Sequence, residues 1–280
     1  MPATVAGNHL AGLPPPPDPN ALRRLLDQRA FRIVYQPVVE LKNGKVFAYE
    51  ALVRCSEPGF ENPLVLFQTA VEAGWTGELG RMLREISSQN APEETLFLNI
   101  HPAELNEKWL VQPSDPIYQH SGEVYLEITE GVPLSHFHLC QTILSEVRGR
   151  GIHLVVDDLG AGYSNLKYIA DLQPRVVKID RGLVAGLTID SRLFKLVSSI
   201  VMMCRELGAS VVAEGIETQE ELSAVQASGA RFGQGYFLAR PAFPLPEVNW
   251  PGSIDPSRTQ TRRKERPRGG RLRSNTRDPR

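Results

Sequence analysis

The 280-residue sequence is poor in cysteine and has no long hydrophobic run. Its three cysteines, Cys55, Cys140 and Cys204, lie far apart and form no CxxC pair, which argues against a disulfide framework and a structural zinc site. No apolar run approaches the ~20 residues that a membrane-spanning helix needs. Residues 1–13 lack the basic and apolar regions of a signal peptide. We therefore expect a cytoplasmic protein without a membrane span.

The net charge of −1 combines two regions of opposite sign. Residues 256–280 hold ten Lys and Arg residues against two acidic ones, a net charge of +8, and the other 255 residues carry −9. Leu272 is the only large apolar residue of this basic end, so residues 253–280 are predicted to be a disordered Arg-rich tail. Such a tail can contact nucleic acid or an anionic surface non-specifically. A solvated tail that docks on the acidic body is the simpler alternative.

The N-terminal region differs in another way. Residues 1–20 include Pro14–Pro17 and Pro19 and few large apolar groups, which is typical of a disordered Pro-rich leader. The remaining segment, residues 21–252, has room for one domain, and about 250 residues is the usual size of an α/β barrel. We therefore expect one folded domain between two disordered ends.

Short β-rich apolar runs alternate with helix-length segments through this domain. The first two runs flank Asn43-Gly44, a strong hairpin signal, so the chain is predicted to open with an antiparallel pair. The pattern as a whole predicts an α/β fold, a TIM-like (β/α)8 barrel with an antiparallel first strand. The eight predicted strands are residues 31–39, 46–53, 96–100, 123–129, 152–157, 175–179, 210–213 and 231–238.

Polar residues stand where most of these runs stop. In a barrel the carboxyl ends of the parallel strands open on one rim, so residues that are distant in sequence converge there. A single strand-end Asp or Glu would most often cap a helix, but the repetition indicates a site. Carboxylates, an amide and a lysine on one rim suit divalent metal and phosphate. The residues are Glu50, Asn99, Glu127, Asp157, Asp158, Lys178 and Glu214.

The segments that carry these residues resemble the EAL-domain cyclic-di-GMP phosphodiesterases. The tripeptide Glu50-Ala51-Leu52 alone would mean little, but matching segments follow one another in order over roughly residues 21–241. They are residues 35–37, 50–54, 98–99, 126–130, 156–164, 177–180, 212–218 and 233–236.

The resemblance implies a site that holds two Mg²⁺ or Mn²⁺ ions. It assigns one ion to Glu50, Asn99, Glu127 and Asp157, with Asp157 bridging to a second ion that Asp158 also binds. Oxygen ligands of this kind are those that hard divalent cations prefer. Two ions about 3.5–4 Å apart can activate a water and stabilise both oxygens of an in-line phosphoryl displacement.

The resemblance also assigns roles to residues around the metals. Glu214 corresponds to a general base, and Lys178 lies near the same water, where we expect it to provide electrostatic stabilisation. The residues implied to bind the dinucleotide are Gln36, Arg54 and Gln234. Glu130 corresponds to an anchor of the loop that follows Asp157-Asp158, and Asp180 and Glu217 to polar residues that support the site.

The sequence thus predicts a phosphodiesterase that hydrolyses cyclic-di-GMP to linear pGpG and lowers the level of this bacterial second messenger. An EAL-fold receptor that binds the nucleotide and acts through protein contacts is the alternative. A vestigial domain with a nucleic-acid-binding tail is a third interpretation. Receptors typically lose metal ligands or the lysine, and none is lost here, which favours hydrolysis. A homodimer is compatible with the resemblance.

Overall fold

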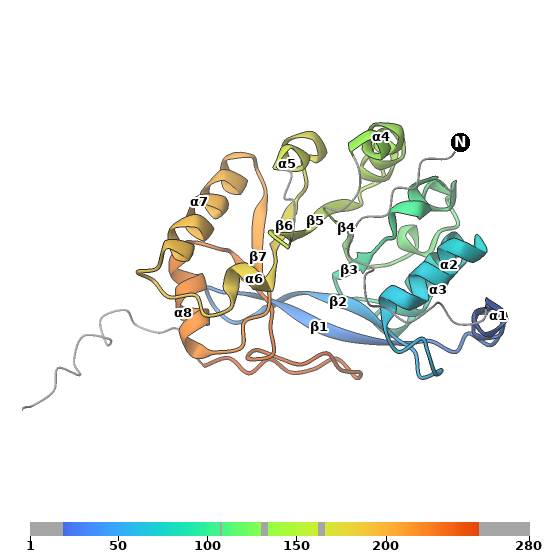
Figure 1. Ribbon diagram of the computed structural model, residues 1–280, viewed down its shortest axis with the longest axis horizontal. Coiled ribbons are helices and arrows are strands. Elements are labelled where there is room, and N and C mark those ends of the chain that lie inside the picture. The colour runs from blue at the N-terminus through green and yellow to red at the C-terminus, as the bar shows by residue number, and fades with distance from the viewer. Residues whose placement is uncertain (1–18, 107, 130–133, 162–165, 252–280) are drawn as a thin grey trace, which may run out of the picture.

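The computed structural model describes residues 19–106, 108–129, 134–161 and 166–251. Eight strands form a closed barrel in chain order (Figure 1). β1 is antiparallel to β2 and to β8, and the other neighbouring strands are parallel. The predicted barrel with an antiparallel first strand is therefore confirmed. The strands are β1 Arg32–Glu40, β2 Val46–Arg54, β3 Leu96–Asn99, β4 Val124–Thr129, β5 His153–Leu159, β6 Val176–Ile179, β7 Ser210–Ala213 and β8 Phe232–Gly233.

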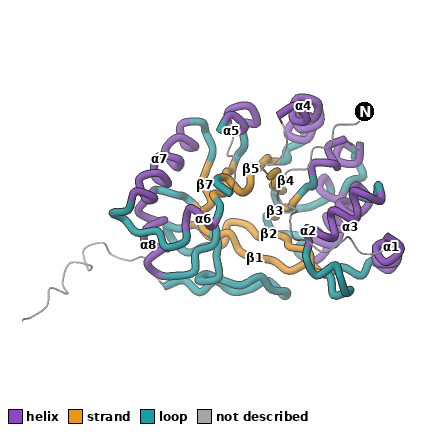
Figure 2. Tube along the Cα trace, viewed as in Figure 1, coloured by secondary structure: helices purple, strands orange, loops and turns teal. Residues whose placement is uncertain are grey.

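Helices surround most of the barrel (Figure 2). Local signals fix several helix ends: the Asn62 side chain caps α2, and Thr218 and Glu221 form a capping box at α8. No described helix is long and apolar enough to cross a membrane. The α-helices are α1 Pro19–Gln28, α2 Pro63–Ala73, α3 Thr76–Asn90, α4 Leu134–Gly149, α5 Lys167–Leu172, α6 Arg181–Val184, α7 Arg192–Glu206 and α8 Gln219–Ser228, and the 3-10 helices are η2 Pro102–Asn106, η3 Lys108–Val111 and η4 Pro116–Tyr118.

Two separate apolar clusters stabilise the fold. The larger one lies between the strands and the surrounding helices. The smaller one contains one buried residue from each strand, which places it inside the barrel. Side chains alternate between these two clusters along a strand, as the period of two requires. The residues of the inner cluster are Val38, Ala48, Phe97, Tyr125, Val155, Val176, Val212 and Phe232.

The structure corrects some predicted element boundaries. β8 ends at Gly233 instead of residue 238, because the chain turns where Gly235 approaches the backbone of Ile216; a Cβ atom at Gly235 would lie 2.1 Å from that carbonyl oxygen. β2 ends at Arg54, one residue beyond the predicted end, and Glu50 lies in the middle of the strand, although the polar site residues were expected where the apolar runs stop. α1 begins at Pro19, within the last two residues of the leader that was predicted to be disordered over residues 1–20. The predicted leader up to residue 18 and the basic tail lie outside the described residues.

Candidate functional site

The polar residues of the site continue the inner side of the barrel wall. In every strand, the residue two positions from the inner apolar residue, toward the rim, is polar or charged. Because side chains alternate with period two, these residues also face the barrel interior. Eight strands thus supply one polar ring above an apolar floor. Its members are Gln36, Glu50, Asn99, Glu127, Asp157, Lys178, Glu214 and Gln234.

Lys178 lies at the centre of this ring. Its side chain is 1% exposed, and its Nζ atom contacts carboxylates from four other strands or strand ends. The distances are 2.7 Å to Oε1 of Glu214, 2.8 Å to Oε1 of Glu127, 3.2 Å to Oδ1 of Asp157 and 3.3 Å to Oε2 of Glu50. The ammonium group therefore holds together four acidic groups that would otherwise repel one another.

Burial and mutual repulsion shift the protonation of these acids. Burial raises the pKa of Glu127 well above its usual range, and the neighbouring Glu50 carboxylate raises it further. Burial also raises the pKa of Asp157, and that of Glu214 to about 8. Burial opposes the charge of Lys178, but the surrounding carboxylates outweigh it and raise the pKa of this ammonium. Lys178 therefore keeps its charge while the acids retain protons more strongly than in water.

Glu50 is the exception among the acids. Burial acts to raise its pKa, but Lys178 and the amides of Gln234 and Asn99 together bring the pKa below its usual value. Nδ2 of Asn99 donates to Oε1 of Glu50 over 3.3 Å, and Nε2 of Gln234 donates to Oε2 over 2.8 Å. Glu50 is therefore a buried but ionised carboxylate.

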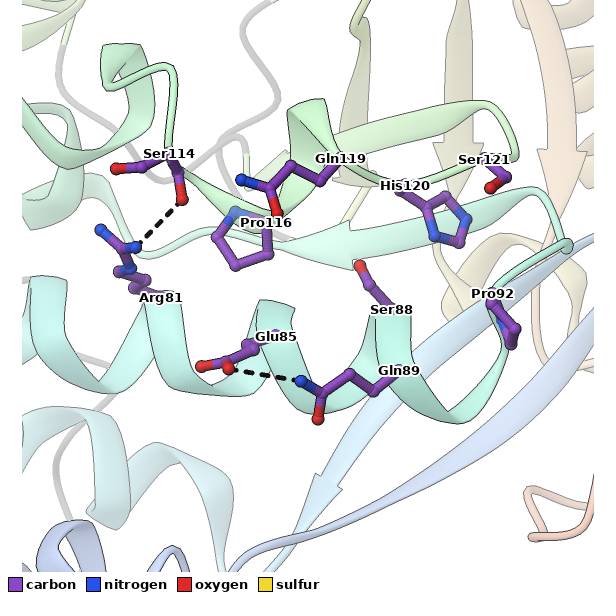
Figure 3. A pocket seen from close by; sticks show the side chains of 10 residues that line it. All are labelled: Arg81, Glu85, Ser88, Gln89, Pro92, Ser114, Pro116, Gln119, His120 and Ser121. Atoms are coloured by element: carbon purple, nitrogen blue, oxygen red, sulfur yellow. Dashed lines mark hydrogen bonds between the residues drawn. The ribbon is translucent and has the colours of Figure 1, made fainter.

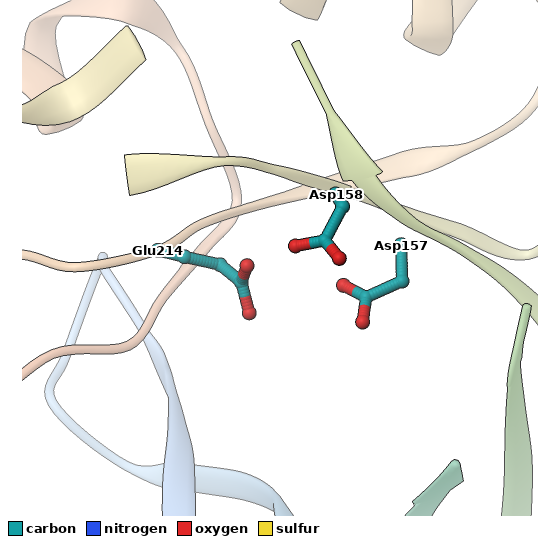
Figure 4. Close-up of side chains that lie close together, drawn as sticks. All are labelled: Asp157, Asp158 and Glu214. Carbon is teal, nitrogen blue, oxygen red and sulfur yellow. The ribbon is translucent and has the colours of Figure 1, made fainter. Parts of the chain in front are cut away.

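Asp157, Asp158 and Glu214 point toward one another at the mouth of the ring (Figure 4). One oxygen from each lies within 4.8 Å of the others. Asp158, near the end of β5, adopts a φ of 59°, and its side chain points into this cluster. Burial and the neighbouring Asp157 raise the pKa of Asp158 to about 6. Oxygen donors that are gathered this closely can bind a divalent cation.

Glu127 provides a further test of whether a metal fits. Oε2 of Glu127 is fully buried and has no hydrogen-bond partner. A buried carboxylate oxygen without a partner is costly, and a cation would satisfy it. The oxygen donors of Glu127 and of the Asp157, Asp158 and Glu214 cluster therefore suit a divalent cation, and the metal set of Glu50, Asn99, Glu127, Asp157 and Asp158 stays a prediction.

Two glutamines connect the ring to the surrounding backbone. Nε2 of Gln234 also donates to Oε1 of Gln36 over 3.2 Å, and Nε2 of Gln36 donates to the carbonyl oxygen of Ala239 over 3.0 Å. Both glutamine side chains are buried. The predicted substrate-binding residues Gln36 and Gln234 thus lie beside Glu50.

Three other predicted site residues form hydrogen bonds or ion pairs with groups outside the ring. Nη1 of Arg54 donates to the carbonyl oxygen of Val53. Asp180 caps α6 by accepting a hydrogen bond from the backbone of Gly182. Glu217 forms an exposed ion pair with Arg181 at 3.0 Å. Glu130, the predicted loop anchor, lies outside the described residues.

A buried trio of charged residues near β3 was not predicted from the sequence. Arg84 of α3 is 2% exposed and contacts Glu104 at 2.5 Å and Asp115 at 2.9 Å. Glu104 also accepts a hydrogen bond from the backbone N–H of His101, two residues after Asn99. The trio therefore fixes the loop that follows a predicted metal ligand. Its members are far apart in the chain, so no spacing in the sequence indicated it.

A surface hollow of about 440 Å³ lies between α3 and the β3–β4 connection (Figure 3). Arg81 spans it to the carbonyl oxygen of Ser114, and Glu85 and Gln89 line its floor. It shares no residue with the ring around Lys178. The candidate site is therefore the ring and not this hollow.

Sequence comparison gives an independent view of the chain. Residues 19–241 match a family model described as the EAL domain. The chain is 30% identical over 234 residues to the bifunctional diguanylate cyclase/cyclic di-GMP phosphodiesterase MucR of Pseudomonas aeruginosa, which covers 79% of this chain and 34% of MucR. It is 27% identical over 237 residues to the cyclic di-GMP phosphodiesterase PA2567 of the same organism, with coverages of 80% and 40%. The chain thus spans less than half the length of these relatives.

Solved structures with the same architecture include two nucleotide complexes. The PaMucR phosphodiesterase with c-di-GMP matches at a TM-score of 0.70 and 28% identity, over 80% of this chain and 96% of that chain. The Klebsiella pneumoniae BlrP1 complex with manganese and cyclic di-GMP matches at a TM-score of 0.64 and 27% identity, over 82% of this chain and 62% of that chain.

Proposed function

The chain belongs to the EAL domain family, whose model matches residues 19–241, and we propose that it hydrolyses cyclic-di-GMP to the linear dinucleotide pGpG. The observation that carries this proposal is the buried ring in which Lys178 contacts four carboxylates from four different strands or strand ends. Burying so many charges is costly for a fold that needs only stability, so the arrangement favours a chemical role. Names and complexes of the related proteins agree with this substrate.

The reaction adds water to one phosphodiester bond of the cyclic dinucleotide. The water oxygen forms a bond to phosphorus, the bond from phosphorus to the 3′ oxygen breaks, and the product carries a 5′ phosphate and a free 3′ hydroxyl. Two Mg²⁺ or Mn²⁺ ions bound by Glu50, Asn99, Glu127, Asp157 and Asp158 would supply charge neutralisation and a more acidic water. Gln36, Arg54 and Gln234 hold the dinucleotide in our proposal.

The remaining two residues act on the proton and the charge. Glu214 takes the proton of the attacking water, and its pKa of about 8, which burial raises, means that its carboxylate holds an accepted proton more strongly than an exposed glutamate would. Lys178 keeps its proton, because the surrounding carboxylates raise its pKa, and it stabilises the negative charge that builds on the phosphate. Lys178 also keeps the acids in place before substrate binds.

A product assay tests the proposal against the receptor alternative. Purified protein is incubated with cyclic-di-GMP in Mg²⁺, Mn²⁺, Ca²⁺ or EDTA, and the nucleotides are separated over time. We expect pGpG with Mg²⁺ or Mn²⁺, little with Ca²⁺, which prefers longer bonds and more ligands, and none with EDTA. Tight binding without any pGpG would instead identify a receptor. The predicted homodimer and the contact of residues 253–280 with nucleic acid or anionic surfaces stay predictions, which light scattering and salt-dependent binding would test.

A further inference from the structure

Few residues pair between β1 and β8, where the barrel closes. β1 pairs with β2 from Arg32 to Val39, but the pairing with β8 covers two positions, Val39 with Gly233 and Glu40 with Phe232. The half of β1 nearer the rim, which holds Gln36, therefore has one edge that β8 does not reach. An unpaired strand edge leaves backbone groups without partners and lets the strand move.

A C-terminal strap, residues 242–250, covers this edge. The backbone N–H of Tyr35 donates to the carbonyl oxygen of Ala242 over 2.8 Å, and the N–H of Ala242 donates back to Tyr35 over 3.0 Å. Figure 2 shows that loop, and not helix, runs beside β1 here. The strap begins where the family match ends, at residue 241.

The far end of the strap is anchored as well. The ring of Trp250 lies directly on Gly44, the turn residue of the β1–β2 hairpin; a Cβ atom at Gly44 would lie 2.3 Å from Cγ of Trp250. Asn249 donates its backbone N–H to the carbonyl oxygen of Leu238 over 2.8 Å. Val248 and Trp250 pack on the main core. The strap is thus tied to β1 near the rim and to the hairpin turn at the other end of β1.

The strap is connected to the site through neighbouring residues. Tyr35 holds the strap on one side of the strand, and Gln36, the next residue, faces the ring. The side-chain amide of Gln36 donates a hydrogen bond to the carbonyl oxygen of Ala239, three residues before Ala242. It also accepts a hydrogen bond from the side chain of Gln234, which in turn donates to Glu50. Movement of β1 away from the strap would therefore displace Gln36 from the ring.

We propose that the strap, through Trp250 and Ala242, positions Gln36 for nucleotide binding, so that residues beyond the family match set substrate affinity. The inference rests on the proposed function, because it takes cyclic-di-GMP as the ligand of Gln36. The strap residues touch no reacting group, so they are positioning residues. Their loss should weaken binding and leave the proton transfer at Glu214 largely intact.

The test compares Trp250→Ala with Trp109→Ala, which removes an exposed tryptophan on η3, away from β1. The readouts are KM and kcat, cyclic-di-GMP affinity in Ca²⁺, and amide hydrogen exchange at Tyr35 and Gln36. We expect Trp250→Ala to speed exchange at both amides and to raise KM and the binding Kd about fivefold, the effect of one lost hydrogen bond, with kcat within about twofold. Trp250→Phe should restore most of the affinity. Trp109→Ala should leave KM, kcat, the Kd for cyclic-di-GMP and amide exchange at Tyr35 and Gln36 unchanged.

A chain ending at Pro241 is compared with one ending at Pro251 as a second pair. The longer chain should match the full-length protein in affinity, and the shorter one should bind as weakly as Trp250→Ala or worse. Unchanged exchange at Tyr35, or an unchanged Kd in Trp250→Ala, would overturn the proposal. Wild-type protein that binds cyclic-di-GMP but forms no pGpG would overturn the proposed function instead, and the ratio of Kd values would still test the strap.

Discussion

Oε1 of Glu214 lies 2.7 Å from Nζ of Lys178, and yet the pKa of Glu214 is raised to about 8. A contact with an ammonium group alone would lower a carboxyl pKa, but burial and the nearby Asp157 and Glu50 outweigh it. Glu214 is thus poised to exchange a proton near neutral pH, while Lys178 stays charged. Within one site, Glu214 can therefore exchange a proton while Lys178 provides a positive charge.

Replacing Glu214 by glutamine should separate binding from chemistry. The variant Glu214→Gln keeps the shape of the side chain but cannot accept a proton, so we expect kcat to fall by about 10²–10⁴-fold with the affinity for cyclic-di-GMP nearly unchanged. Steady-state kinetics and equilibrium binding measure the two effects. The matched control is Glu72→Gln on α2, whose exposed carboxylate accepts a hydrogen bond from Gln68 and was not assigned to the site. Near-native turnover in Glu214→Gln would show that another group accepts the proton.

Removing Lys178 should destabilise the protein in EDTA. Lys178→Met leaves buried carboxylates without their shared counter-charge, and breaking a buried ion pair costs about 3–5 kcal/mol of unfolding free energy. Urea unfolding in EDTA measures this loss. The control Lys167→Met breaks an exposed pair with Asp171 and should cost at most about 1 kcal/mol. We also expect excess Mn²⁺ to recover part of the stability of Lys178→Met, and equal stability of both variants in EDTA would contradict this account.

Cation affinity should rise with pH. A raised carboxyl pKa means that the folded protein holds a proton which a metal ion must displace, so binding is weakened below that pKa and strengthened above it. The predicted ligand Asp158 has a pKa of about 6, and Glu214, whose carboxylate lies beside it and attracts a cation when ionised, has a pKa of about 8. Titration calorimetry with Mn²⁺ should therefore show tighter binding at about pH 8.5 than at about pH 5.5, with proton release in between. An affinity that is independent of pH would show that these acids are already ionised.

The buried trio behind β3 should matter for stability. Arg84→Met removes the only cation that contacts Glu104 and Asp115 among the described ion pairs, and it should cost about 3–5 kcal/mol of unfolding free energy. Arg29→Met breaks the exposed pair with Glu85 at 3.0 Å and serves as the control, with an expected cost below about 1 kcal/mol. Urea unfolding of both variants gives the comparison. A small cost at Arg84 would mean that water reaches the two acids.

Strand periodicity made much of the fold and the ring predictable. Phe97 and Asn99, or Val176 and Lys178, lie two positions apart on one strand, so an apolar interior residue and a site residue follow from the same pattern. The parallel order of the strands then brings Asn99 and Lys178 to one rim. Ordinary rules of strand geometry thus place the ring without any knowledge of side-chain contacts.

Other features depend on contacts that no local pattern encodes. No local pattern indicates the φ of 59° at Asp158, and the early end of β8 follows from the close approach of Gly235 to the backbone of Ile216. In the sequence, Trp250 stands at the end of a Pro-rich segment and has no apparent partner. In the structure, its ring covers Gly44 near the start of the domain. Such long-range contacts are tertiary, and a single sequence carries no spacing that indicates them.

Hydrolysis in ¹⁸O-labelled water with Mn²⁺ is the most direct test of the central claim, that the ring around Lys178 is the site of metal-dependent attack by water on cyclic-di-GMP. The products are analysed by mass spectrometry, with EDTA and with Glu50→Gln, which removes a predicted metal ligand, as controls. The account predicts pGpG that carries one ¹⁸O atom in its 5′ phosphate, formed with Mn²⁺ by the wild type and strongly reduced in both controls. Intact cyclic-di-GMP with wild-type protein and Mn²⁺, or equal product from Glu50→Gln, would contradict it.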